Sequence, residues 1–517
     1  MHVFRNARIY TGDRAKPLVQ ALAVDGETIV AAGEESEVRK AVGPSAELVD
    51  LDGAAVLPGL NDSHIHTANY ARGLSEVDLR DARCLEEALA AISEHAMRLA
   101  PGAWLFGGRW NSNTWERPVQ PDRLALDAVC PDRPVALPSI DGHTVWVNSV
   151  ALRMVGIDRT TPDPVGGEIA RDAAGEPTGI LRESASYPLR ELMTGGELRP
   201  QLRAAQEELL ALGLTSVHDI DGEDCRAAYL EMYGAGELKL RVHKAIPVKH
   251  LDAAIEEGRF TGQGDAWFST GPVKLFSDGA LGSHTCHMSR PFSGDSHNVG
   301  IAVTPYDELL RLIRRANAAG IAVATHAIGD QANHLVLDAY EEVGTRGRLR
   351  NRIEHAQHLR RADILRMARL GVVASMQPVH CTSDIDLVDS LLAEQQLSSY
   401  AWRTMLNTGV PLAFGSDAPV EHPNPFPALH AAVTRTRSDG TPPGGWQPQE
   451  RLSMAEALTA HTLGSAYASG EEAVKGVLAP GRLADLIAVD TDPFVDPVLH
   501  TQVLTTVVGG EVRWRRS

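Results

Sequence analysis

The sequence predicts an α/β fold: a (β/α)8 TIM-type barrel, a small β-sandwich domain built from both termini, and an inserted subdomain after the first barrel strand. Three observations predict it. Eight short β-rich runs alternate with helical stretches in the middle of the chain, and eight such units close a barrel. Short strands separated by turns occupy both ends of the chain. The gap between the first two β-rich runs is too long for one crossover.

The two ends of the chain carry the same strand pattern. Residues 1–57 hold the alternating segments VFRNARIY and ALAVDGETIVAAG, which are separated by Gly and Asp turns. The C-terminal segments KGVLAPGRLADLIAVD and TQVLTTVVGGEVRWRR repeat this pattern. Neither end has enough strands to form a stable sheet of its own. We therefore predict one composite β-sandwich, made of residues 1–57 and 470–517.

The barrel is predicted over residues 58–469. Its eight strand-forming runs are, in order, AAVLPGLNDSHIH, GLTSVHDI, LKLRVHKAI, GPVKLFSDG, GIAVATHAIGD, RNRIEHAQ, GVVASMQP and VPLAFGSDAP. Amphipathic helices are predicted between several of these runs, for example over 305–319, 331–343 and 361–370. Residues from about 70 to 211 are predicted to form the inserted subdomain, where frequent Pro and Gly indicate loops.

Composition argues against several classes of protein. Hydrophobic residues make up 43% and charged residues 22% of the chain, as in soluble globular enzymes. The 49 Lys and Arg against 67 Asp and Glu give a net charge of −18, and an acidic surface repels nucleic acid and anionic lipid. The N-terminal segment lacks the apolar core of a signal peptide, and five scattered cysteines fit free thiols in a reducing compartment. We expect a cytoplasmic protein with a small-molecule substrate, no nucleic-acid or membrane partner, and a homodimer as its candidate assembly.

Side chains that can bind metal stand near the carboxyl ends of the predicted barrel strands, where such barrels place their active sites. The first strand ends in His64-Ile65-His66, and residues two apart on a strand share one face. The other candidates, on later strands, are Lys274, His326, His355 and Asp417. Each has an ordinary alternative: a lone histidine packs in a core, Lys274 pairs with Asp278, and Asp417 caps a turn. The joint pattern favours a metal centre.

The residue types indicate which chemistry this centre supports. Imidazole and carboxylate suit Zn²⁺, Fe²⁺ or Mn²⁺, and we expect one or two divalent ions, with zinc as the first choice. Lysine is a poor ligand while it is protonated, but desolvation at a strand end depresses the pKa of its amine. The neutral amine of Lys274 can then add CO2, and we hypothesise that the N6-carboxylated side chain bridges two ions.

Five segments resemble a known family: LPGLNDSHIH, VKLFSDGALGSHT, THAIGD, RIEHAQ and FGSDAPVE. They are similar to motifs of the amidohydrolase superfamily, in particular its amidohydrolase type 3 branch, which includes N-substituted formamide deformylases. The resemblance runs nearly the whole length, from RNARIYTGD to GVLAPGRLADLIAVDTDPF. One loop departs from the family pattern, because this chain has Gly282-Ser283-His284-Thr285 where the family commonly reads GSRT. An arginine that would fix an anionic or polar substrate group is therefore missing from this loop.

The resemblance implies a role for each candidate ligand. The implied ligands are His64, His66 and Asp417 for the first ion, His326 and His355 for the second, and carboxylated Lys274 bridging both. Asp417 is also the implied general base, which takes a proton from the water that attacks the substrate carbonyl and returns it to the leaving amine. The chain is thus identified as a metal-dependent amidohydrolase.

The predicted reaction is hydrolysis of a non-peptide C–N bond, in a linear amide or an N-substituted formamide. Two alternatives stay open. One is a hydrolase of the same scaffold that acts on a cyclic amide, an ester or an amidine, the last by deamination. The other is a catalytically silent binding protein, which would be expected to lack ligands, and here none is missing. No GxGxxG follows a strand, so the sequence carries no dinucleotide-binding fingerprint.

Four further residues are candidates for substrate binding: His143, His380, Glu183 and Trp110. The resemblance suggests that His143 faces the substrate, with a structural loop histidine as the alternative. His380 is expected to line the pocket or to bond the scissile carbonyl. For Glu183 the alternative is a solvated carboxylate, and for Trp110 a place in the core. His218 and Asp219 are predicted to orient metal ligands.

Overall fold

The protein folds into two compact units. The computed structural model describes residues 1–74, 76–112, 114–117, 119–140, 142, 144–164, 167–189, 197–344 and 349–516. Met1–Ala68 and Leu202–Ser517 form the first unit, and Asn69–Gln201 form the second. The second unit therefore follows the first barrel strand, as the sequence predicts for the inserted subdomain. None of the helices in the described ranges has both the length and the apolar character needed to cross a membrane.

The first unit is built on a sheet of eight parallel strands, which confirms the predicted barrel. In sheet order these are β8 (Leu60–Ile65), β15 (Leu214–Asp219), β16 (Arg241–Pro247), β17 (Phe268–Phe276), β18 (Val323–Ala327), β19 (Arg352–His355), β21 (Val373–Met376) and β23 (Leu412–Phe414). Strands adjacent in the sheet also follow one another along the chain, as βα units require. Just beyond β23, Asp417 N donates to His64 O at 2.7 Å and His66 N donates to Ala418 O at 2.9 Å. These two bonds draw the last strand toward the first.

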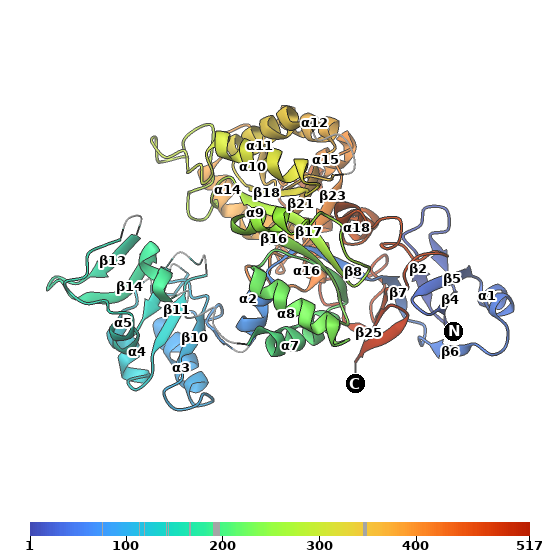
Figure 1. The fold of residues 1–517 in the computed structure, drawn as a ribbon, viewed down its shortest axis with the longest axis horizontal. Coiled ribbons are helices and arrows are strands. Elements are labelled where there is room, and N and C mark those ends of the chain that lie inside the picture. The colour runs from blue at the N-terminus through green and yellow to red at the C-terminus, as the bar shows by residue number, and fades with distance from the viewer. Residues whose placement is uncertain are drawn as a thin grey trace. The chain divides into compact units, whose positions relative to one another are not determined.

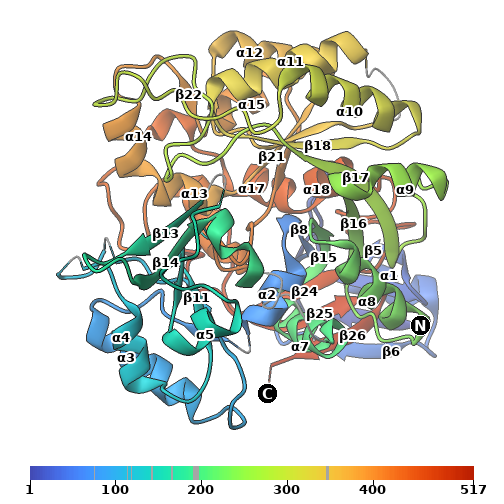
Figure 2. The ribbon, with the colours of Figure 1, turned by 60° about the vertical axis from the view of Figure 1, so that its left-hand side comes forward.

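Helices follow the barrel strands. The first unit has α1 (Glu35–Val42) in its N-terminal part, and the helices after its barrel strands are α8 (Glu223–Gly234), α9 (Leu251–Glu256), α10 (Tyr306–Ala318), α11 (Asp330–Val343), α12 (Arg361–Leu370), α13 (Pro378–Ser383), α14 (Ile385–Leu391), α15 (Trp402–Thr408), α16 (Pro425–Thr434), α17 (Met454–His461) and α18 (Leu463–Ser469). In both views α10, α11 and α12 lie outside β18 and β21 (Figures 1 and 2). On α10, Leu309 and Ile313 are buried while Arg311 and Glu308 pair on the exposed side. The buried and exposed residues of α10 thus follow the predicted 3.6-residue helical periodicity.

Local sequence signals set several helix ends. Ser453 and Glu456 form a capping box at the start of α17, which satisfies two backbone N–H groups. Gly371 ends α12 with φ +68°, a left-handed conformation that favours glycine. Two helices contain the boundary between the units, namely α2 (Thr67–Gly73) and α7 (Leu198–Ala211).

Both termini build the sheets beside the barrel. One sheet has the order β5-β4-β1-β6, with β5 (Thr28–Gly33), β4 (Ala21–Asp25), β1 (His2–Arg5) and β6 (Glu47–Asp50). The other has the order β26-β25-β24-β7-β2-β3, with β26 (Glu511–Arg515), β25 (Val503–Val508), β24 (Leu486–Val489), β7 (Ala55–Pro58), β2 (Arg8–Tyr10) and β3 (Leu18–Val19). In Figure 1 the red C-terminal β25 lies near the blue N-terminal β7. Strand β24 joins them, because it pairs antiparallel with both.

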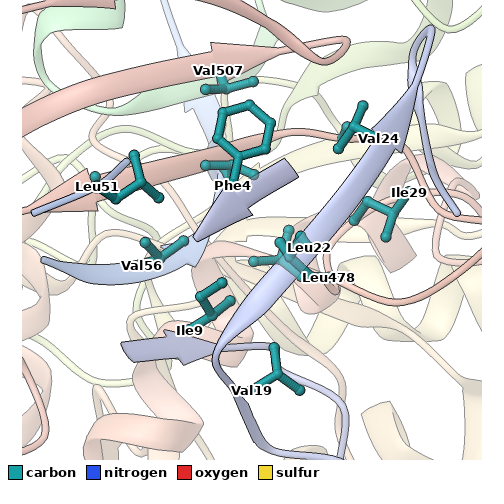
Figure 3. Packing of buried hydrophobic residues seen from close by; sticks show 13 residues of the cluster. Phe4, Ile9, Val19, Leu22, Val24, Ile29, Leu51, Val56, Leu478 and Val507 are labelled. Atoms are coloured by element: carbon teal, nitrogen blue, oxygen red, sulfur yellow. The ribbon is translucent and has the colours of Figure 1, made fainter. Parts of the chain in front are cut away.

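One hydrophobic core joins these two sheets. Its labelled members in Figure 3 are Phe4, Ile9, Val19, Leu22, Val24, Ile29, Leu51, Val56, Leu478 and Val507, and all of them are buried. Residues from the start and the end of the chain thus share a single cluster, which explains why neither end forms a sandwich alone. The predicted composite β-sandwich is confirmed, while the exact limits 1–57 and 470–517 stay a prediction.

The second unit has a sheet of its own. Its order is β13-β14-β12-β11-β10-β9, with β13 (Gly167–Arg171), β14 (Pro177–Glu183), β12 (Thr144–Val147), β11 (Val135–Pro138), β10 (Leu105–Gly108) and β9 (Val77–Asp78). Helices α3 (Leu85–Ala96) and α4 (Arg123–Val129) contribute Ile92 and Leu126 to its main core, which also holds Trp110, Trp115 and Trp146. The tryptophans of the insertion therefore include three that are core residues.

Candidate metal centre

The six predicted metal ligands come from the carboxyl-terminal parts of barrel strands. They are His64 in β8, His66 just after it, Lys274 in β17, His326 in β18, His355 at the end of β19, and Asp417 after β23. All of them belong to the first unit. Because the strands are parallel, these ends meet at one rim of the barrel. The structure therefore brings together residues that lie up to 353 positions apart, from 64 to 417.

Asp417 lies between the two histidines of the HxH motif. Its Oδ1 is 3.3 Å from Nε2 of His64 and 3.5 Å from Nε2 of His66. Lys274 approaches the same group, since its Nζ is 3.5 Å from Nε2 of His64. Both Nε2 atoms of the motif therefore converge on one carboxylate oxygen.

His355 connects this group to His326. The ring centroid of His355 lies 4.9 Å from that of His64 and 4.6 Å from that of His326. One ligand atom each from His64, His355 and Asp417 lie within 4.8 Å of one another, so these three residues can share one ion. The cluster is therefore continuous across the rim.

Carboxylates hold the two imidazoles of the HxH motif. Nδ1 of His64 is hydrogen-bonded to Oε2 of Glu354, which is fully buried. Nδ1 of His66 lies 2.8 Å from Oδ1 of Asp221. The other oxygen of Asp221 accepts a hydrogen bond of 2.7 Å from the N–H of Ala68. Each carboxylate occupies Nδ1 and leaves Nε2 directed at the centre.

Neutral oxygens hold the other two imidazoles. Nδ1 of His355 lies 2.8 Å from Oε1 of Gln377. Nε2 of His326 lies 3.1 Å from the carbonyl oxygen of Gly279, and the Asp278 carboxylate is farther away at 3.5 Å. Asp278 instead accepts hydrogen bonds from backbone N–H groups of the neighbouring loops. The alternative that Lys274 pairs with Asp278 therefore finds no support in the contacts of Asp278.

The donor set fits a divalent cation. Each of the four imidazoles uses one nitrogen on a protein partner, so one nitrogen per ring stays available. Within the described ranges, the ion-pair partners of Asp417 are all histidines: His64, His66 and His380. An anionic carboxylate surrounded by imidazoles is the combination that Zn²⁺, Fe²⁺ and Mn²⁺ prefer. These side chains would supply nitrogen and oxygen ligands without any rearrangement of the strands.

Burial and neighbouring charges set the protonation of the centre. Burial lowers the pKa of Lys274 to about 8, although the carboxylates of Glu354 and Asp417 act in the opposite direction. Burial alone would raise the pKa of Asp417, but contact with His64, His355 and His66 outweighs it and holds that pKa well below the ordinary range. At neutral pH Asp417 is therefore an anion that can accept a proton.

The turn that carries Asp417 is fixed against the first barrel strand. Oδ1 of Asp62 accepts hydrogen bonds of 3.0 Å from the N–H groups of His64 and Ser416. A side chain at Gly415 would meet the backbone nitrogen of His64 at 2.5 Å, so only glycine allows this approach. Asp417 itself has φ +59°, a strained conformation for a non-glycine residue. Hydrogen bonds to β8 hold this strained conformation, which directs the Asp417 carboxylate at the HxH motif.

His380 also reaches the centre. It lies on α13, directly after the seventh barrel strand, and it is 9% exposed. Its Nε2 is 3.9 Å from Oδ2 of Asp417, and its ring stacks at 6.0 Å on that of His355. Nε2 has no hydrogen-bond partner among the described residues. A buried polar atom without a hydrogen-bond partner is available to bind a ligand.

The other three predicted substrate contacts belong to the second unit. Trp110 is 3% exposed, and its indole N–H donates to the carbonyl of Leu137 at 2.7 Å. These contacts give Trp110 a packing role, as the core alternative expects. Glu183 ends β14 and is exposed. His143 lies outside the described residues. Substrate binding by these three residues stays a prediction.

Sequence reasoning missed the residues that hold the histidine rings. Asp221, Glu354 and Gln377 were not singled out, although Glu354 directly precedes a candidate ligand and is a charged residue inside a barrel strand. The predicted ring-orienting residues contact other groups. Asp219 pairs with Lys244 at 2.8 Å, and His218 lies 2.9 Å from a guanidinium nitrogen of Arg352. The residue that holds the His66 ring is thus Asp221, two positions after the predicted Asp219.

Comparisons with known proteins find relatives along nearly the whole chain. The sequence model of the amidohydrolase family matches residues 47–513. The chain is 33% identical to the Arabidopsis thaliana protein LONG AFTER FAR-RED 3, over 98% of this chain and 90% of that protein. It is 31% identical to the N-substituted formamide deformylase of Arthrobacter pascens, over 99% of this chain and 98% of that protein. A metal-dependent hydrolase from Pyrococcus horikoshii has a similar structure, with a TM-score of 0.82, 30% identity, and 96% and 99% of the two chains covered.

Proposed function

The chain belongs to the amidohydrolase family and is a metal-dependent hydrolase, and on that premise we propose that it cleaves linear amides, with N-substituted formamides as the first candidates. The observation that carries this proposal is the position of Asp417, whose Oδ1 lies within 3.5 Å of Nε2 of both His64 and His66. The same carboxylate can therefore bind a cation and accept the proton of a water molecule beside it.

The proposed centre holds one or two divalent ions, with zinc as the first choice. The side chains that would hold them are His64, His66 and Asp417 on one side, and His326 and His355 on the other. Lys274 is buried and lies 3.5 Å from Nε2 of His64. We propose that its amine adds CO2 and loses a proton, so that the resulting carbamate supplies an anion to both ions.

The residues of the chain divide the chemistry between them. A divalent cation, when bound, supplies the Lewis acidity that lowers the pKa of water and polarises a carbonyl. Asp417 would take the proton from the attacking water and pass it to the leaving nitrogen as the C–O bond forms and the C–N bond breaks. His380 would donate from Nε2 to the carbonyl oxygen of the substrate, since that atom is buried beside Asp417. An acid and an amine leave.

The substrate class rests on the relative that is named as an N-substituted formamide deformylase, at 31% identity over nearly the whole chain. In the loop after β17 this chain has His284, whose ring lies 5.6 Å from that of Phe292. A histidine at this place, without an arginine, suits an uncharged substrate better than an anionic one. The proposal therefore favours neutral formamides and amides.

A substrate panel tests this function. Purified protein is incubated with N-substituted formamides, longer linear amides, cyclic amides, amidines and esters, and formate, ammonia and free amine are measured. Release of formate with an equal amount of amine supports the proposal. Activity should disappear after removal of metal by a chelator and return when Zn²⁺ is added. Ammonia release from amidines alone, or ring opening alone, would replace this proposal with another reaction of the same scaffold.

A homodimer and a cytoplasmic location are also proposed. The five cysteines are free thiols, and four of them are buried, which fits a reducing compartment. Light scattering during size-exclusion chromatography distinguishes a dimer from a monomer, and cell fractionation of the producing organism tests the location.

A further inference from the structure

We propose that the two halves of this centre bind metal with unequal affinity, and that the half containing His64 and His66 is the tighter, because carboxylates stand behind both of its imidazoles. This inference rests on the proposed function, since it assigns an order of filling to the same metal centre. It also gives Glu354 and Asp221 a role as positioning residues. They act through the histidines and do not touch the substrate.

The argument begins with the effect of a carboxylate on a histidine ring. An anion that accepts the Nδ1 proton fixes the tautomer, holds the ring in place, and makes Nε2 a stronger electron donor. A neutral carbonyl oxygen fixes the tautomer in the same way but draws the proton less strongly. Two rings backed by anions therefore offer a cation better ligands than two rings backed by amides.

Glu354 is secured as an anion. It is fully buried, and its Oε1 lies 2.5 Å from Nε of Arg352, which is itself 1% exposed. The guanidinium of Arg352 also contacts Nδ1 of His218 at 2.9 Å and the carbonyl of Ser63 at 3.1 Å. The arginine is thereby locked beside Glu354. The Glu354 oxygen that bonds His64 belongs to a paired, ordered carboxylate.

Asp221 holds His66 from another direction. One carboxylate oxygen is bonded to Nδ1 of His66 at 2.8 Å, and the other accepts from the N–H of Ala68 at 2.7 Å. The backbone of the segment is also held, because Lys244 Nζ donates to the carbonyl of Asp221 and pairs with Asp219 at 2.8 Å. The carboxylate cannot turn away without breaking these contacts.

The half with His326 and His355 lacks such support. Gln377 offers an amide oxygen to His355, and Gly279 offers a backbone carbonyl to His326. The Asp278 carboxylate is 3.5 Å from Nε2 of His326, but its oxygens are already taken up by three backbone N–H groups. A carbamate on Lys274 would serve both halves alike. Asp417 contacts both imidazoles of the HxH motif, with Oδ1 within 3.5 Å of each Nε2, while a ligand atom of His355 also lies within 4.8 Å of it.

The test measures metal binding directly. Metal-free full-length protein is titrated with Zn²⁺ in competition with a chromophoric chelator, and bound zinc is counted by mass spectrometry. The wild type should show two steps, with the first at least about tenfold tighter. Asp221→Asn and Glu354→Gln should each weaken the first step by about 10- to 100-fold and leave the second nearly unchanged. Gln377→Glu, which places an anion behind His355, should tighten the second step.

Matched variants make each outcome decisive. Asp363→Asn removes a buried carboxylate that lies 3.0 Å from His334 between α11 and α12, so it should change neither step. His66→Asn should abolish the tighter step, whereas His326→Asn should abolish the weaker one. If Glu354→Gln does not fold, as judged by circular dichroism, Asp221→Asn still decides the question.

Three results would overturn the inference: two equal steps in the wild type, loss of the tighter step in His326→Asn, or no effect of Asp221→Asn on the first step. Each of these leaves the proposed hydrolase intact if zinc still binds and the substrate panel is still cleaved. A wild-type chain that binds no divalent ion would contradict the proposed function itself. The two failures are therefore distinguishable.

Discussion

The ion pair between Arg352 and Glu354 should be among the most valuable charged contacts in the barrel. Both side chains are buried, at 1% and 0% exposure, and Nε and Oε1 are 2.5 Å apart. Glu354→Gln would leave the guanidinium with only neutral acceptors, since burial keeps the pKa of His218 well below its usual value. Removal of one partner of a buried pair costs about 3–5 kcal/mol. That is a large part of the roughly 5–15 kcal/mol that stabilises a typical domain.

A double-mutant cycle separates the free-energy cost of leaving one charge unpaired from the net contribution of the ion pair to stability. Arg352→Met alone leaves Glu354 uncompensated, while Arg352→Met with Glu354→Gln removes both charges. The double variant should therefore be less destabilised than the sum of the single variants, by about 0.5–3 kcal/mol. Because the chain has two units, a single unfolding transition is not expected. Hydrogen exchange of the β19 amides in metal-free protein reports the opening free energy of the barrel itself.

An exposed pair provides the control. Arg311 and Glu308 lie 2.6 Å apart on α10 with 54% and 44% of their side chains exposed. Glu308→Gln should change stability by less than about 1 kcal/mol, because exposed pairs are screened by solvent. The reasoning fails if Glu354→Gln is no more destabilising than Glu308→Gln, or if the single effects simply add. In either case the barrel interior would screen charge much as water does.

Three further predictions concern activity, metal content and pH. Asp417→Asn should lower kcat/KM by about 10²- to 10⁴-fold, as expected for loss of a general base, and metal analysis of the variant shows whether its ligand role is lost as well. Lys274→Ala should bind fewer ions than the wild type, and two ions per chain in the variant would refute the bridging carbamate. For Glu456, the bond from Arg403 lowers the pKa from 4.5 to about 2, so its stabilising contribution is fully present above pH 4.5 and is lost as the pH falls toward 2. The Tm difference between the wild type and Glu456→Gln should therefore shrink over that range, and a difference that grows would contradict the assignment.

The barrel was predictable because its strands are buried on both faces. Most of the eight runs combine a short apolar stretch with polar residues near its end, and every residue of β8 and β15 is buried. The composite β-sandwich was predictable because Gly and Asp turns separate short strand-like segments at both ends of the chain. The candidate ligands were found because they stand at strand ends, which lie at one rim in any parallel barrel. Their metal-binding roles remain proposals, although the structure gathers them in one cluster.

The partners of the histidine rings were not predictable, for a geometric reason. Asp221 lies 155 positions from His66 along the chain, and Glu354 lies 290 positions from His64. Strand periodicity fixes which face a residue occupies, but not which ring its side chain reaches. Asp219 and Asp221 share the same alternation, and only the path of the chain after β15 decides between them. Substrate binding by residues of the insertion is harder still to predict, because strand periodicity does not show which side chains a substrate would meet.

Charge compensation within the barrel explains why the centre attracts a cation. Two buried cations in this interior are paired with carboxylates: Lys244 with Asp219 at 2.8 Å, and Arg352 with Glu354 at 2.5 Å. Asp417 differs, since its ion-pair partners in the described part of the chain are all imidazoles. A buried carboxylate costs free energy unless a positive charge stands beside it. A divalent ion bound among these side chains would supply that charge, so the position of Asp417 among ligand imidazoles favours the binding of a cation.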